Sequence, residues 1–269
     1  MPEIESAWRD REVIINGIDG GAEWENARYF FENENITIGL LNDENTMYIR
    51  LSSRDRIMQR QLLTLGFTVW FDEKGGRKKT LGIHFPLGSK TGGMEMIRRD
   101  KNASMNDDLE QFRKMIEASQ IDIEIIGPGK DAHTTLTVED VRELGIHVKM
   151  DVSKGNLVYE LQIPLLRSES QPYGIGMERA QAIGLGLESG KIDPAQMKSQ
   201  MGNRGDSARS SGGRGGMDGM GGMGGGRGGG RGGGGKGGGG RGGMGGGEMM
   251  PEPVELWLKT ELASEPAVL

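Results

Sequence analysis

The sequence contains no cysteine, which excludes disulfide bonds, thiolate metal sites and cysteine nucleophiles. Aromatic residues make up only 5% of the chain, so few side chains are able to stack on a flat ligand. No apolar run reaches the length of a membrane span, and we expect no membrane-spanning segment. Residues 1–6 have neither a basic n-region nor an apolar h-region, so no signal peptide is expected at this start.

The sequence also lacks the usual patterns of catalytic sites. Its three histidines, His84, His133 and His147, are scattered and form neither a His-x-His nor an HExxH motif. There is no P-loop and no Gly-x-Ser-x-Gly nucleophile motif. These absences favour a binding protein over an enzyme.

Glycine is in excess, and it is concentrated in one tract. Residues 212–247 contain 26 glycines in 36 positions. A segment of this composition cannot bury enough apolar surface to offset its ordering entropy, so the tract is expected to be disordered. The residues after it, 254–262, alternate apolar and polar side chains like a half-buried strand. We therefore interpret the tract as a long loop, followed by a strand that returns to the same domain.

The charge is distributed unevenly. The chain has a net charge of −6, yet residues 200–250 carry seven basic and three acidic side chains, which leaves −10 on the remainder. A basic glycine-rich segment attached to an acidic body is the one plausible contact for a polyanion.

Nine segments show the alternation or the short apolar runs of β-strands, with turn residues between them. They are 36–40, 47–51, 67–71, 81–85, 121–125, 146–152, 157–163, 183–187 and 254–262. Helical spacing is confined to short segments that begin after Asp55, after 106–108 and at Thr137, which forms a capping box with Asp140.

Many short strands with sparse helices predict an all-β fold, an antiparallel β-sandwich of jelly-roll or immunoglobulin-like type with a few short peripheral helices. The predicted organisation has five parts. They are an N-terminal extension (1–11), the sandwich (12–190), a disordered loop rich in Gly, Arg and Met (191–252), the closing strand (253–263) and a tail (264–269).

Four motifs resemble those of family nine carbohydrate-binding modules and related DOMON-like sandwiches of bacterial type, here with a glycine-rich insertion. Residues 18–24, IDGGAEW, resemble the opening "IDG…EW" of these modules, and 42–49 resemble their acidic turn and following strand. Residues 69–72 match a central strand that ends in an acidic turn, and 160–165 match a late strand that ends in "IPL". Thr68 stands where the family has an acidic residue.

The resemblance covers residues 12–187 and 254–262, and it implies a non-catalytic, glycan-binding and extracytoplasmic module. Sugar rings stack on aromatic side chains, and the candidate ligand-binding residues are Trp70, Trp257, Tyr48 and Trp24. Trp70 and Trp257 alternate with the apolar residues of their strands, so each projects from the less apolar side. The other interpretation is that these aromatic side chains pack in the core.

Asp19, Asp43 and Asp72 lie in expected turns and carry the oxygen ligands that Ca²⁺ prefers. Aspartates in turns also accept backbone hydrogen bonds, so turn capping is the alternative. No cofactor is otherwise indicated, and the sequence carries no signal for an oligomeric state.

The glycine tract allows a different function. Its Arg-Gly-Gly repeats, at Arg214, Arg227, Arg231 and Arg241, resemble RNA-binding segments in which guanidinium groups contact phosphates. The aromatic side chains that stack on bases are missing, which argues against nucleic acid. The Met-x-x-Met spacing at 217–223 is compatible with Cu(I), but neither His nor Cys assists it. A flexible spacer is the third interpretation.

Overall fold

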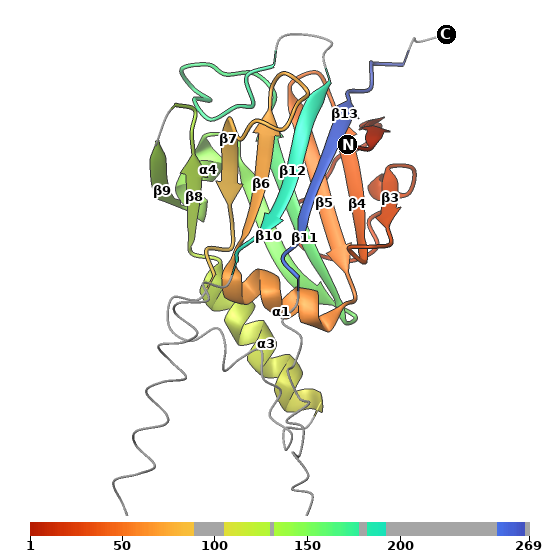
Figure 1. The fold of residues 1–269 in the computed structure, drawn as a ribbon, viewed down its shortest axis with the longest axis vertical. Coiled ribbons are helices and arrows are strands. Elements are labelled where there is room, and N and C mark those ends of the chain that lie inside the picture. The colour runs from red at the N-terminus through yellow and green to blue at the C-terminus, as the bar shows by residue number, and fades with distance from the viewer. Residues whose placement is uncertain (89–104, 130–131, 178–181, 192–251, 267–269) are drawn as a thin grey trace, which may run out of the picture. The chain divides into compact units, whose positions relative to one another are not determined.

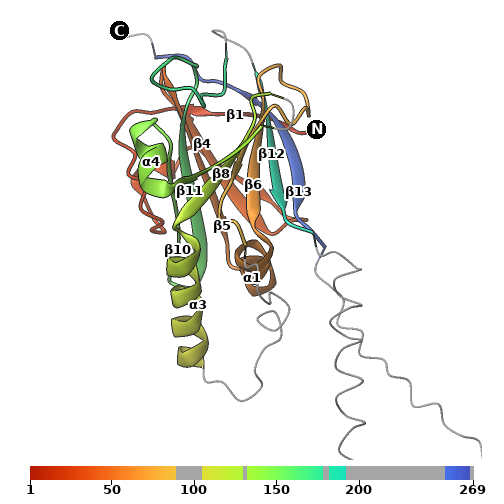
Figure 2. The ribbon, with the colours of Figure 1, turned by 90° about the vertical axis from the view of Figure 1, so that its left-hand side faces the viewer.

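The computed structural model describes residues 1–88, 105–129, 132–177, 182–191 and 252–266. These residues belong to one compact unit, Met1–Lys191 together with Pro251–Leu269. The unit consists of two β-sheets packed face to face with a few helices around them, which confirms the predicted all-β sandwich (Figures 1 and 2).

The first sheet has seven strands in the order β1, β13, β12, β6, β7, β8, β9. Their bounds are Glu3–Glu5 (β1), Glu255–Glu261 (β13), Ile183–Ser189 (β12), Phe67–Asp72 (β6), Leu81–His84 (β7), Asp122–Ile126 (β8) and His133–Thr137 (β9). All neighbouring strands are antiparallel except β1, which runs parallel to β13.

The second sheet has six strands in the order β10, β11, β5, β4, β2, with β3 also pairing with β4. Their bounds are His147–Ser153 (β10), Asn156–Pro164 (β11), Thr46–Ser53 (β5), Ile36–Asn42 (β4), Ala7–Trp8 (β2) and Arg28–Phe31 (β3). The predicted strands 146–152 and 157–163 form a hairpin of β10 and β11, in which Ser153 lies opposite Asn156.

The core lies between the sheets because every second residue of each long strand points inward. In β6 the side chains of Phe67, Val69 and Phe71 are completely buried, whereas Thr68 and Trp70 between them are partly exposed. The predicted strand 121–125 is shifted by one residue. Ile121 precedes β8 and is 62% exposed, because the core contacts on this strand come from Ile123 and Ile125.

Two helices lie at one end of the sandwich, one lies beside the edge strands β9 and β10, and a 3₁₀ helix lies on the outer face of the second sheet (Figures 1 and 2). Helix α1 (Arg56–Leu65) begins after Asp55, whose carboxylate accepts the N–H groups of Ile57 and Met58. Helix α4 (Val138–Glu143) has the predicted capping box of Thr137 and Asp140. The others are α3 (Met105–Ser119) and the short 3₁₀ helix η1 (Ala22–Trp24). No helix among the described residues is long and apolar enough to cross a membrane.

The N-terminal segment is part of the sandwich rather than an extension, contrary to the expectation for residues 1–11. β1 and β2 enter the two different sheets. The segment that follows packs Val13, Trp24 and Ala27 on the outward residues Leu41 and Tyr48 of the second sheet. Strands of two or three residues are too short for a periodic signal, which is why the sequence did not reveal them. The outer face of the second sheet is therefore covered by the beginning of the chain.

The segment after the glycine tract forms β13, which lies between β12 and β1. Leu258 of β13 lies opposite Leu185 of β12, and both side chains are completely buried. The predicted loop 191–252 lies outside the described residues except at its two ends.

We expect Leu258→Ala to lower the free energy of unfolding by about 2–5 kcal/mol, because it leaves a cavity in the core. Glu261→Ala, at an exposed position of the same strand, should change it by less than about 0.5 kcal/mol. Urea denaturation followed by circular dichroism measures both. Equal midpoints for the two variants would contradict a place for β13 in the core.

Candidate functional site

Two of the predicted aromatic residues lie in one row on the outer surface of the seven-stranded sheet. Trp257 of β13 lies opposite Gly186 of β12, which in turn lies opposite Trp70 of β6. Trp70 lies opposite Gly82 of β7. The row thus crosses four neighbouring strands and alternates tryptophan with glycine. We call the outer surface of this sheet around Trp70 and Trp257 the aromatic face.

Both indole rings lie against the glycine of the neighbouring strand. A Cβ atom on Gly82 would come within 2.5 Å of the Trp70 ring, and one on Gly186 within 2.7 Å of the Trp257 ring. Only glycine leaves room for a ring at these positions. Both glycines are buried under the rings, whereas Trp70 and Trp257 remain partly exposed. The rings therefore cover the sheet instead of standing away from it.

Trp70 is held in place by polar partners. Its indole N–H donates to a carboxylate oxygen of Glu188 at 3.0 Å. The Lys79 ammonium forms an ion pair with the same carboxylate and lies 5.0 Å from the centre of the Trp70 ring. Burial raises the pKa of Glu188, but the hydrogen bonds from Lys79 and Trp70 and the charge of Lys79 outweigh it, and the pKa lies below its usual value. Glu188 is thus ionised at neutral pH and keeps Lys79 over the ring.

Further charged pairs surround the row. Lys191 contacts Glu255 and Glu188, and on the other side of Trp257 the Lys259 ammonium contacts Glu3 at 2.9 Å. Lysine and glutamate thus alternate around the two rings, which gives the aromatic face both hydrogen-bond donors and acceptors. In Figure 1 no helix or strand of the described residues lies in front of β6, β12 and β13.

A second polar cluster lies on the adjacent strands of the same surface. Glu124 of β8 accepts hydrogen bonds from His84 at 2.8 Å and from His133 at 2.9 Å. Burial raises the pKa of Glu124, but these two hydrogen bonds outweigh it and leave the pKa below its usual value. The three residues come from three different strands, which is why the two histidines are scattered in the sequence.

The other two predicted platforms, Trp24 and Tyr48, lie on the opposite sheet and are not available as platforms. Trp24 is completely buried, with its ring over Gly39 and the Arg50 guanidinium 6.0 Å from the ring centre. Tyr48 is 4% exposed, and the Arg9 guanidinium stacks on its ring. Both were predicted as ligand-binding residues, and the correction follows from the N-terminal segment, which covers this face.

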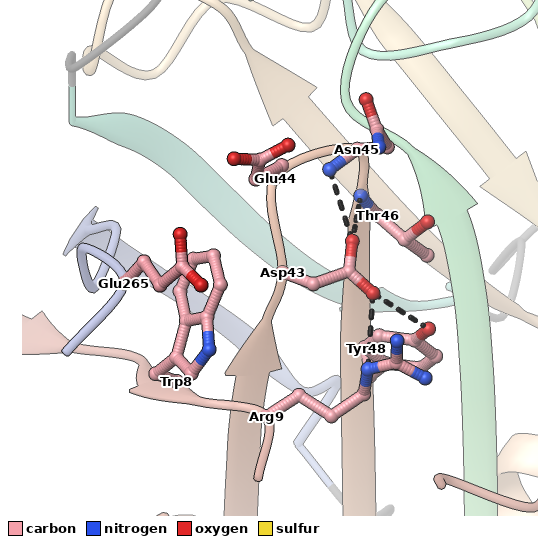
Figure 3. A pocket seen from close by; sticks show the side chains of 8 residues that line it. All are labelled: Trp8, Arg9, Asp43, Glu44, Asn45, Thr46, Tyr48 and Glu265. Atoms are coloured by element: carbon pink, nitrogen blue, oxygen red, sulfur yellow. Dashed lines mark hydrogen bonds and ion pairs between the residues drawn. The ribbon is translucent and has the colours of Figure 1, made fainter. Parts of the chain in front are cut away.

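Tyr48 nevertheless lines a pocket at the turn between β4 and β5, with a volume of about 370 Å³. We call it the turn pocket. It is lined by Trp8, Arg9, Asp43, Glu44, Asn45, Thr46, Tyr48 and Glu265. Figure 3 shows Trp8 and Glu265 on one side of the pocket, Arg9 and Tyr48 on the other, and Glu44 at the turn between them. Three separate parts of the chain build this pocket, and sequence reasoning identified only Asp43 and Tyr48 as site residues.

The three aspartates predicted as Ca²⁺ ligands each have other partners. Asp43 accepts the N–H groups of Asn45 and Thr46, each at 2.9 Å. Asp72 accepts those of Lys74 and Lys78 in the turn after β6.

Asp19 forms an ion pair with the buried Arg50 at 2.7 Å. Within the part of the chain that the structure describes, no three His, Asp or Glu side chains are arranged to hold a metal ion. Asp43 and Asp72 therefore act as turn caps. The polyanion residues Arg214, Arg227, Arg231 and Arg241 lie outside the described residues.

The contact between Trp70 and Gly82 is testable by a double-mutant cycle. We expect Gly82→Ala to lower the free energy of unfolding by about 1–3 kcal/mol, because the methyl group pushes the ring from the sheet. The same substitution in a Trp70→Ala background should cost much less, and the difference between the two costs measures the coupling. Urea denaturation gives all four stabilities. Additive effects would show that the ring does not cover Gly82.

No model of a known protein family matches the sequence, and no curated protein matches it either. Among solved structures, the fold is similar to a family nine carbohydrate-binding module from Caldicellulosiruptor kristjanssonii in complex with glucose. The identity is 12%, the TM-score is 0.34, and the match covers 72% of this chain and 80% of that chain. The fold is also similar to a family nine module from the same organism in complex with cellotriose. There the identity is 11%, the TM-score is 0.32, and the match covers 71% of this chain and 78% of that chain. These similarities are distant and support no functional conclusion by themselves.

Proposed function

We propose that this chain is a non-catalytic module that binds an extended glycan on its aromatic face. The observation that carries the proposal is the row of Trp257 and Trp70 over glycines, across neighbouring strands. Pyranose rings present flat C–H faces, and aromatic rings bind such faces by stacking. Two indoles that lie along a sheet form a flat platform, which is suited to a linear chain of sugars.

The spacing of the rings favours a particular ligand geometry. Each ring extends over the next strand of the sheet, and both extend in the same direction. The Trp257 ring extends from β13 over β12, and the Trp70 ring from β6 over β7. The two rings therefore stay two strands apart, which is about 10 Å for neighbouring strands spaced at about 4.8 Å. In an extended β-1,4-linked chain, the length of each sugar unit is about the distance between two neighbouring strands. A chain that runs across the strands would thus place every second sugar over a tryptophan.

The charged pairs around the rings support the same ligand class. Sugar hydroxyls both donate and accept hydrogen bonds, and Glu188, Lys191, Glu255 and Lys259 offer both partners at the edges of the row. A flat, open surface buries little of the ligand, so we expect dissociation constants of roughly 10 µM to 1 mM.

Isothermal titration calorimetry with cellohexaose tests the proposal. We expect binding to the wild-type chain, and Trp257→Ala should weaken it at least about tenfold, because one of two stacking contacts is lost. Trp257→Ala should affect cellobiose much less, because a disaccharide does not reach both rings. Phe30→Ala removes an exposed aromatic side chain from β3 in the other sheet and serves as the matched control.

Two results would contradict the proposal. The first is a folded Trp257→Ala protein with unchanged affinity for the hexasaccharide. The second is an absence of binding to cellohexaose and to other β-linked oligosaccharides such as xylohexaose and chitohexaose. Near-UV circular dichroism establishes that each variant is folded before its affinity is measured.

Lys79 covers the Trp70 ring, on which a sugar would stack. Its ammonium lies over Trp70, and an exposed cation–π contact of this kind contributes about 0.5–1 kcal/mol. Lys79→Ala should therefore increase the affinity for the hexasaccharide by about twofold to fivefold. Lys74→Ala changes another exposed lysine in the same turn and should leave the affinity unchanged. Weaker binding by the Lys79 variant would mean that the ammonium is a sugar contact and not a cover.

A further inference from the structure

The turn pocket lies on the other sheet from the aromatic face and is built by a separate set of contacts. Its organising residue is Asp43, whose carboxylate accepts two backbone N–H groups of the turn and the Tyr48 hydroxyl at 3.2 Å. The same carboxylate binds Nε of Arg9 at 3.0 Å. Asp43 is therefore fully engaged within the protein, and its function in the pocket is to hold Arg9.

Arg9 is held on two sides and still has donors to offer. Its guanidinium lies against the Tyr48 ring, with 5.5 Å between the guanidinium carbon and the ring centre. Only Nε is used by Asp43, and the two terminal amino groups make no hydrogen bond to any residue that the structure describes. The pocket thus contains a pre-oriented guanidinium with free N–H groups. Because this side chain is already held in place, a ligand that binds it causes little further loss of conformational entropy.

The wall with Glu265 is also fixed by buried contacts. Asn42, which is 2% exposed, accepts the N–H of Ala263 at 3.0 Å and donates to its carbonyl oxygen at 3.0 Å. The Ser6 hydroxyl donates to the Asn42 side chain at 2.6 Å and accepts the same Ala263 N–H at 3.1 Å. These bonds hold the chain two residues before Glu265, which lines the pocket beside Trp8 (Figure 3).

We propose that the turn pocket binds a single neutral pyranose, either a free monosaccharide or the terminal ring of a glycan. The Trp8 ring supplies a stacking surface, Arg9 supplies donors, and Glu44 and Glu265 supply acceptors. A neutral polyhydroxylated ring uses both kinds of partner. An anion would face the carboxylates of Glu44 and Glu265. A cation would pair with those carboxylates but would leave the N–H groups of Arg9 without an acceptor.

This site differs from the aromatic face in the shape that it selects. The aromatic face is flat and suits several sugars in a row, whereas a pocket of about 370 Å³ at a turn suits one ring. The inference does not depend on the proposed function, because the two sites share no residue. Each can therefore fail without the other.

The four tryptophans provide a separate reporter for each site. In the full chain labelled with ¹⁵N, each indole N–H gives one signal, and Trp→Phe variants assign them. We expect methyl glycosides of the common hexoses and of N-acetylglucosamine to shift the Trp8 signal, with a dissociation constant on the order of 1 mM for the preferred sugar. The signal of the buried Trp24 should stay constant, and those of Trp70 and Trp257 should respond to cellohexaose instead.

Two variants distinguish the pocket from unspecific contact. Glu44→Gln removes one charge from an exposed turn and should weaken binding of the preferred glycoside at least about threefold. Trp8→Ala, followed through the backbone amides of the turn, should weaken it at least about tenfold. Glu139→Gln, an exposed glutamate on α4, is the matched control and should leave the affinity unchanged.

Three results would overturn the inference. One is a Trp8 signal that does not move with any glycoside up to about 50 mM, where a site of 1 mM would be saturated. Another is a titration midpoint, followed through the backbone amides of the turn, that is the same in the wild-type chain, Glu44→Gln and Trp8→Ala. The third is a response to N-acetylarginine amide but to no sugar, which would assign the pocket to a cation. Trp70 and Trp257 report the aromatic face independently in the same spectra.

Discussion

The pairing of β13 with β12 determines both candidate binding surfaces. β13 places Leu256 and Leu258 in the core, and the alternation of the strand then directs Trp257 outward. Because Trp257 lies opposite Gly186, it joins the row that contains Trp70. The residues just after β13 reach Asn42 on the second sheet, where Ala263 is bound through both its N–H and its carbonyl group. One strand that returns from far along the chain thus completes the aromatic face and brings Glu265 to the turn pocket.

The two outer surfaces of the sandwich differ because only one of them is covered. Each of three tryptophans lies over a glycine, with Trp24 on Gly39, Trp70 on Gly82 and Trp257 on Gly186. Trp24 is then sealed by the N-terminal segment and by Arg50, and it contributes to stability. The other two rings keep one side exposed, which costs part of the hydrophobic gain that full burial would give. That difference, and not the presence of tryptophan itself, is what makes Trp70 and Trp257 the candidate binding residues.

The sequence predicted the features that depend on local periodicity. The strands with regular alternation and the caps of α1 and α4 follow from spacing alone, and the outward direction of Trp70 and Trp257 follows in the same way. β1, β2 and β3 are short strands that pair with longer strands of the sheets. Their pairing depends on these tertiary contacts, so their own residues show little periodicity from which a strand could be predicted. The turn pocket was missed for a related reason. Trp8, Asp43 and Glu265 are far apart in the chain, and only the tertiary contacts of Asn42 and Ser6 bring them together.

The motifs that carry the family resemblance turn out to build the fold. Asp19 of the IDG segment binds Arg50, and Glu160 of the IPL segment accepts the N–H groups of Asn16 and Gly17. Arg50 and Glu160 lie opposite each other on β5 and β11, and burial lowers the pKa of Arg50 and raises that of Glu160. Removing one member of such a buried set costs about 3–5 kcal/mol, because its partner is left without compensation. A chain can therefore keep these motifs for stability alone. Evidence for a ligand must come from residues outside them, which is why Trp257, Trp8 and Arg9 are more informative about function than the motifs themselves.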